Sequence, residues 1–213
     1  YLMIDGSVHS AIQCSDYRTV MRYAAALDVT KYLYSFSGEL LLIGLGGGCI
    51  AKSFLADGWK VDAVELDPVV SELAFRFFGL RRDDIHLSVM DGRQFLIQNR
   101  KHYDLIIVDA FGSSSIPFHL ITSEAFAELQ RHLNRDGVLA INVETAGWHH
   151  PLINSLARTL AASFQHVQAL PTMEPPDAVG NVLLLGARRE LTFPEEWLGH
   201  PRDFLDDEYA HWA

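Results

Sequence analysis

The sequence predicts an α/β domain built on a doubly wound sheet of about seven strands, mostly parallel, with an antiparallel last strand. Short apolar runs alternate with amphipathic segments, as strands and helices do when helices cover both faces of a parallel sheet. Glycines stand at several of the junctions, where helices commonly end. The last two apolar runs are separated by the loop TMEPPDA alone, which is too short for a helical crossover, so these strands should pair antiparallel.

The core elements follow one another in a regular order. Strands are expected at 39–45, 60–66, 84–92, 103–111, 136–144, 166–171 and 180–188. Helices are expected between them at 49–58, 67–80, 93–100, 122–133 and 150–164. Pro68 suits the first turn of its helix, and Gly58 and Gly79 suit helix ends.

The chain divides into three parts. Residues 1–36 predict a short N-terminal strand or hairpin, with Asp5 and Gly6 at its turn, followed by one amphipathic helix over 15–35. Residues 37–190 predict the Rossmann-like domain, and 191–213 a C-terminal tail packed on that same domain.

Composition disfavours several classes of function. The net charge is −10, so no basic stripe is available to bind a nucleic-acid backbone. No apolar run reaches the roughly 18 residues that a membrane-spanning helix needs. Cys14 and Cys49 do not belong to a zinc-ligand spacing, so we expect no metal site. Free thiols and the lack of an apolar leader favour a reducing, cytoplasmic location.

A glycine-rich turn follows the first core strand, in LLIGLGGGCIAKSF. Gly44, Gly46, Gly47 and Gly48 let the backbone approach a ligand closely, and the helix after them presents free N–H groups. Glycines also serve tight packing, so the turn alone is weak evidence for a nucleotide.

Acidic residues end the next three predicted strands. Glu65 follows Gly44 by 21 residues, where an acid can accept both hydroxyls of a ribose. Asp91, with Gly92 after it, ends the third strand, and Asp109 ends the fourth. Carboxyl ends of parallel strands meet at one edge of the sheet, so the three acids should share one crevice. A helix cap is the structural alternative for any one of them.

Two cofactors fit this outline. A dinucleotide site requires G-x-G-x-x-G, but Cys49 stands at the third glycine position. An adenosyl sulfonium, S-adenosylmethionine or its decarboxylated form, requires an acid at the ribose, an acid at the adenine and a group at the reacting carbon. Glu65, Asp91 and Asp109 supply these, so we predict this second cofactor, with Leu66 included in its site.

The blocks LLIGLGGG, VDAVELDPVV, HLSVMDGRQFL, YDLIIVDAF and GVLAINV resemble, in order, the spermidine synthase family of polyamine aminopropyltransferases, especially its divergent spermidine synthase-like members. The resemblance covers roughly residues 1–188. It implies that Gly44, Gly46 and Gly48 lie beside the ribose and the methionine-derived tail. It places Glu65 on the ribose, Asp91 and Gly92 at the adenine, and Asp109 before the sulfonium and the acceptor.

Two positions depart from the family pattern. Aminopropyltransferases have an aspartate in the glycine turn that binds the free amine of the cofactor, where this chain has Gly47. They also have a second acid after the fourth strand, in D-x-x-D, that deprotonates the attacking amine. Here DAFG places Gly112 there. An attacking amine must be neutral, so losing this base disfavours aminopropyl transfer. The N-P-P-Y motif of amine and amide methyltransferases is absent as well.

The predicted function is therefore methyl transfer from S-adenosylmethionine to a small-molecule acceptor. Candidate catalytic residues are Asp109, His119 in the following loop, and Glu144 beyond the fifth strand. Two alternatives stay open: polyamine aminopropyl transfer from decarboxylated S-adenosylmethionine, and a non-catalytic nucleoside-binding domain. A dinucleotide oxidoreductase is more distant. No nucleic-acid or membrane partner is expected, and the family resemblance leaves a homodimer open.

Overall fold

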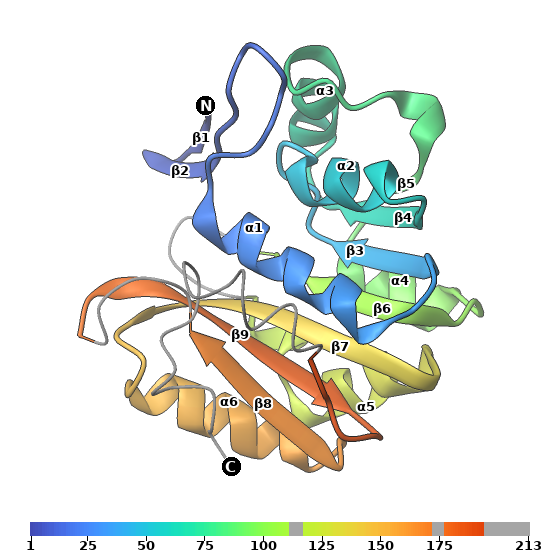
Figure 1. Cartoon of the computed structure of the whole chain (residues 1–213), viewed down its shortest axis with the longest axis vertical. Coiled ribbons are helices and arrows are strands. Elements are labelled where there is room, and N and C mark those ends of the chain that lie inside the picture. Colours follow the sequence, from blue (N-terminus) through green and yellow to red (C-terminus); the bar gives the residue numbers. More distant parts are fainter. Residues whose placement is uncertain (111–116, 172–176, 194–213) are drawn as a thin grey trace.

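The computed structural model describes residues 1–110, 117–171 and 177–193 (Figure 1). Its strands are β1 (Leu2–Ile4), β2 (Ser7–Ser10), β3 (Glu39–Ile43), β4 (Lys60–Glu65), β5 (Ile85–Val89), β6 (Tyr103–Val108), β7 (Leu133–Ala146), β8 (His166–Pro171) and β9 (Val179–Ala187). Its α-helices are α1 (Arg22–Leu27), α2 (Cys49–Ala56), α3 (Pro68–Phe77), α4 (Gly92–Gln98), α5 (Ser123–Arg131) and α6 (Pro151–Ala161). Short 3-10 helices are η1 (Asp28–Leu33), η2 (Arg82–Asp84) and η3 (Phe118–Leu120).

The predicted fold class is confirmed. In the described part of the chain, seven strands form one sheet in the order β5-β4-β3-β6-β7-β9-β8, and β1 pairs with β2 in a separate hairpin. Neighbours from β5 to β7 are parallel, whereas β9 runs antiparallel to both β7 and β8. The sheet is therefore mostly parallel with an antiparallel last strand, as the short final loop predicts.

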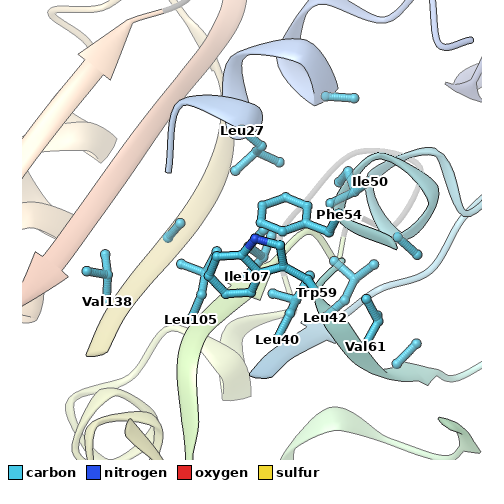
Figure 2. Close-up of a cluster of buried hydrophobic side chains, with 14 of the residues drawn as sticks. Leu27, Leu40, Leu42, Ile50, Phe54, Trp59, Val61, Leu105, Ile107 and Val138 are labelled. Atoms are coloured by element: carbon cyan, nitrogen blue, oxygen red, sulfur yellow. The ribbon is translucent and has the colours of Figure 1, made fainter. Parts of the chain in front are cut away.

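Each face of the sheet buries its own hydrophobic core, because side chains alternate along the strands. Helices α1, α2 and α3 contribute to the first core, where Phe54 and Trp59 pack with Leu40, Leu42 and Ile107 (Figure 2). Helices α4, α5 and α6 contribute to the second core with the strand residues of opposite orientation. Its members include Leu41, Ile106, Leu139, Leu96, Phe126 and Leu160. Two covered faces explain why the central strands read as continuous apolar runs.

The N-terminal part differs from its prediction in one respect. The hairpin turn at Asp5 and Gly6 is confirmed, and both residues have the positive φ that such turns require. The single helix expected over 15–35 is wrong. Tyr17 adopts a φ of 58°, which a helix excludes, and the Thr19 hydroxyl accepts from the N–H of Met21 just before α1 begins. The chain then continues as α1 and η1, two short helices in place of one.

Some element boundaries also differ from expectation. β7 extends to Ala146, because it pairs with β9 as far as Val179. β5 ends at Val89, so Asp91 follows the strand and stands at the N-terminus of α4. The tail beyond residue 193, like Gly112, lies outside the described residues.

The sheet topology fixes the edge at which a ligand crevice is expected. From β3 the chain moves outward through β4 and β5, then returns to β6 on the other side of β3. Ligands of open α/β sheets bind where the strand order reverses in this way, at the carboxyl ends of the strands. β3 and β6 end there at Gly44 and Asp109, and the N–H of Asp109 donates to the Ile43 carbonyl at 2.8 Å.

Candidate functional site

The glycine turn after β3 lies at this edge, beside the end of β6. Gly44, Gly46 and Gly48 have φ values of 96°, 52° and 72°, a region that side-chain-bearing residues rarely occupy. A Cβ at Gly44 would lie 2.3 Å from the Asp109 carbonyl oxygen, so only glycine lets β6 end so close to the turn. Gly44 and Gly46 are partly exposed. Their backbone is therefore accessible to a ligand.

The other two glycines of the turn face protein. Gly47 is buried and donates its N–H to Ser10 Oγ at 2.9 Å. A Cβ at this position would lie 2.7 Å from Phe78 Cδ1 and 2.8 Å from Ser10 Cβ. Gly48 is covered by Leu80, whose Cδ2 would be 2.8 Å from an added Cβ. The cofactor contacts expected of Gly47 and Gly48 stay a prediction, and their surroundings give both glycines a packing role.

Glu65 ties the end of β4 to the glycine turn. Its Oε2 accepts from the N–H groups of Leu45 at 3.0 Å and Gly46 at 3.2 Å, and its Oε1 accepts from the N–H of Asp67 at 3.0 Å. An ionised carboxylate has about four acceptor sites, so the partly exposed side chain keeps capacity for a ligand hydroxyl. Leu66 beside it is 70% exposed and offers an apolar surface at the rim.

Asp91 and Gly92 begin α4 beneath the crevice. Asp91 caps the helix by accepting from the N–H of Gln94 at 3.0 Å, and His119 Nε2 lies 2.8 Å from its Oδ2. Burial alone would raise the pKa of Asp91, but the bonds from Gln94 and His119 outweigh it, so the pKa is below its usual range. A Cβ at buried Gly92 would lie 2.6 Å from Ile43 Cγ2, which shows that this glycine lets α4 approach β3.

Among the three strand-end acids, Asp109 has the pKa that departs furthest from its ordinary value. It stands immediately after β6, and Asn142 Nδ2 on β7 donates to its Oδ1 at 2.8 Å. Burial raises the pKa of Asp109 to about 7, and the nearby negative charge of Glu65 acts in the same direction. The hydrogen bonds of Asn142 and of the Tyr23 hydroxyl on α1 act against this rise. A carboxyl group that titrates near neutral pH can accept a proton from a reacting group.

The structure brings the three strand-end acids to one edge of the sheet, as predicted, and pairs neither of the other two catalytic candidates with Asp109. His119, on η3, is paired with Asp91. Glu144 lies two residues beyond Asn142 along β7 and is exposed. The roles proposed for His119 and Glu144 stay predictions. Among the described residues, no cluster of three or more His, Cys, Asp or Glu side chains is placed to share a metal ion.

Sequence reasoning missed three residues of this site. Ser10 reaches the glycine turn from β2, Tyr23 reaches Asp109 from α1, and Asn142 reaches it from β7. Only Asn142 could have been identified from the sequence, because it is the polar residue within the apolar run VLAINV. No local pattern marks Ser10 or Tyr23, because their contacts are made across the fold.

The spermine/spermidine synthase domain matches residues 28–185, which is most of the chain. The chain belongs to this family. A probable polyamine aminopropyl transferase from Bifidobacterium longum is 30% identical over 168 residues, covering 78% of this chain and 37% of that protein. This member of the spermine/spermidine synthase family thus spans little more than a third of that relative's length.

The family member is also similar to methyltransferases. An N-terminal histidine N-methyltransferase from Emericella nidulans is 36% identical over 107 residues, covering 48% of this chain and 19% of that protein. The solved structure of human methyltransferase-like protein 13 in complex with SAH aligns with a TM-score of 0.71 at 20% identity, over 84% of this chain and 88% of that one. The family membership and the Rossmann-like methyltransferase fold therefore agree. Among the described residues, no helix has the length and apolar character to span a membrane.

Proposed function

We propose that the protein binds S-adenosylmethionine in the crevice and transfers its methyl group to a small-molecule acceptor. The observation that carries this proposal is the packing around Gly47. In the aminopropyltransferases that this chain resembles, an acid at this position binds the free amine of the cofactor. Here Ser10 and Phe78 occupy the space that such a side chain would need.

The residues of the crevice fit an adenosyl group. Gly44 and Gly46 leave backbone accessible at the ends of β3 and β6, and the carboxylate of Glu65 has acceptor capacity left for ribose hydroxyls. The exposed side chain of Leu66 suits one face of a base, and Asp91 suits its polar edge. Methyltransferase-like protein 13, which shares this fold, was solved with SAH.

The cofactor's amino-acid end distinguishes the two sulfonium donors. Decarboxylated S-adenosylmethionine has an amine there without a neighbouring carboxylate, so an acid in the protein would compensate its charge. Intact S-adenosylmethionine has its own carboxylate, and a protein acid close by would repel it. A glycine whose surroundings exclude a side chain therefore favours the intact cofactor.

Asp109 is proposed as the base of the reaction. When bound, S-adenosylmethionine supplies an electrophilic methyl carbon on a sulfonium. The acceptor's lone pair forms the new bond to that carbon as the carbon–sulfur electron pair returns to sulfur, and the acceptor is left with a proton to lose. Asp109, with its pKa near 7, takes up this proton most effectively near neutral pH.

Calorimetry with three separate ligands tests the proposal: S-adenosylmethionine, decarboxylated S-adenosylmethionine and methylthioadenosine. We expect S-adenosylmethionine to bind more tightly than its decarboxylated form, and radiolabelled methyl to appear on a member of a small-amine panel. Strong preference for the decarboxylated form, with turnover of putrescine to spermidine, would replace methyl transfer by aminopropyl transfer. That result is the one expected from the relatives named as polyamine aminopropyltransferases. Tight binding without product from either reaction would instead favour a non-catalytic nucleoside-binding domain.

A further inference from the structure

We propose that Asn181 and Asn142 form a positioning relay, in which Asn181 fixes the amide of Asn142 so that its NH₂ group always faces Asp109. The relay matters for catalysis only if Asp109 is the base proposed above, but it can be tested on the free protein. Neither asparagine belongs to the strand-end acids or to the glycine turn.

Two consecutive hydrogen bonds build the relay across three strands. Asn142 Nδ2 on β7 donates to Asp109 Oδ1 at 2.8 Å, and Asn181 Nδ2 on β9 donates to Asn142 Oδ1 at 2.9 Å. Asn181 is directly opposite Glu144 in the β7–β9 register, so its side chain reaches Asn142 diagonally. Asn142 is 2% exposed, and a buried amide is costly unless both of its ends are bonded. The two contacts satisfy both ends.

The direction of the relay follows from the chemistry of an amide. Asn142 has a donor end and an acceptor end, and a half-turn about its last bond would exchange them. The donor of Asn181 faces the Asn142 oxygen, and this contact favours the orientation that directs the NH₂ group of Asn142 to Asp109. In the opposite orientation, the amide oxygen would face the carboxylate and repel it. Asn181 therefore acts on Asp109 through Asn142, without touching it in this relay.

Other groups around Asp109 also affect the ionisation of its carboxyl group. Glu65 on β4 repels the ionised form, and burial does the same. The Tyr23 hydroxyl on α1 donates to the His9 carbonyl at 3.0 Å and also lowers the pKa of Asp109. The Cys49 thiol on α2 also interacts with the Asp109 charge. Against these groups, the amide held by Asn181 is a fixed donor for the ionised carboxylate.

The protein offers a matched control on the same strand. Asn134, near the start of β7, donates its Nδ2 to Asp104 Oδ1 at 2.7 Å, at the opposite end of β6 from Asp109. This hydrogen bond resembles the one from Asn142 to Asp109, but it lies away from the crevice. Asn134 is exposed whereas Asn142 is buried, so Asn134→Ala controls for loss of an asparagine–aspartate hydrogen bond and not for loss of a buried side chain.

The test is a carbon-13 NMR titration of aspartate carboxyl groups in the cofactor-free protein, with the Asp109 signal assigned through Asp109→Asn. We expect the Asp109 midpoint to rise by about one pH unit in Asn142→Ala, the scale of one hydrogen bond to an ionised group. A smaller rise is expected in Asn181→Ala and in Asn181→Leu, and no change in Asn134→Ala. A wild-type midpoint in either folded Asn181 variant would overturn the relay.

A second measurement needs no substitution at the relay. In the wild-type protein, the side-chain NH₂ signals of Asn142 and Asn181 should both shift with the midpoint of Asp109, because the two amides are bonded in series. An Asn181 signal that stays constant through this titration would refute the relay, even where the variants fail to fold. Both readouts are independent of turnover. A confirmed relay without methyl transfer would refute the proposed function alone, and the converse result would refute the relay alone.

Discussion

The packing at Gly47 can be tested by adding one methyl group. In Gly47→Ala, the new Cβ would lie 2.7 Å from Phe78 Cδ1 and 2.8 Å from Ser10 Cβ, closer than such atoms approach in real proteins. Phe78 is 4% exposed and Ser10 is 5% exposed, so neither can turn out into solvent. The structure must therefore shift around the methyl group.

The cost of that shift can be estimated from its two parts. Overpacking of a buried site typically costs about 1–3 kcal/mol. If the turn moves, the bond from the Gly47 N–H to Ser10 Oγ is lost too, at about 1 kcal/mol. We expect a loss of roughly 2–4 kcal/mol in the free energy of unfolding, which in a chain of this size lowers Tm by on the order of 10 °C.

Urea and thermal denaturation followed by circular dichroism measure this loss. Gly6→Ala is the control, because a Cβ at Gly6 would meet no atom within 4 Å and only its positive φ of 84° would be strained. Adding Ser10→Gly to Gly47→Ala removes one of the two close contacts and should recover part of the stability. If Gly47→Ala is as stable as the wild type, the residues around position 47 can move to accept a side chain. Position 47 could then hold an acid, and the main support for S-adenosylmethionine over its decarboxylated form would be lost.

Four further substitutions address the three strand-end acids. Glu65→Gln should weaken S-adenosylmethionine binding by about 1–3 kcal/mol in calorimetry, through loss of the charged acceptor, and an unchanged Kd would remove the ribose assignment. Asp91→Ala should lower the free energy of unfolding by about 1 kcal/mol through loss of the α4 cap. Asp91→Asn keeps the cap, and if it binds cofactor as the wild type does, Asp91 serves the helix alone. The folded-state pKa of Asp109 is raised to about 7, so its ionisation costs stability as pH rises from about 4 to 7. Asp109→Asn should flatten this decline by roughly 1 kcal/mol per pH unit, and equal slopes in urea denaturation at several pH values would contradict the assigned pKa.

The parts of the fold that depend on local pattern were predictable from the sequence. The apolar run 39–45 and its successors give parallel strands because helices cover both faces of the sheet. The strand order reverses beside β3, so the gathering of Glu65, Asp91 and Asp109 at one edge of the sheet follows from topology. The positive φ of Gly44 and its close approach to Asp109 explain why this turn requires glycine.

Contacts between distant segments were not predictable in the same way. The pattern over 15–35 is amphipathic, yet Tyr17 leaves the helical region of φ because the chain turns back there to pair at Ile12 and Thr19. His119 follows Asp109 in sequence, which suggested a shared reaction, but the fold pairs it with Asp91. The pKa of Asp109 likewise depends on burial by several elements, which no window of sequence contains.

The N-terminal hairpin contacts both the glycine turn and the Tyr23 side chain near Asp109. Through Ser10 it fills the space beside Gly47, so the missing acid is accompanied by a side chain that keeps the position closed. Through the His9 carbonyl it binds the Tyr23 hydroxyl, which lowers the pKa of Asp109. Adjacent residues of one short strand, Ser10 and His9, thus bond the glycine turn and Tyr23. A single change at Gly47 would leave the hairpin in place, so restoring the acid alone should not restore the chemistry of an aminopropyltransferase.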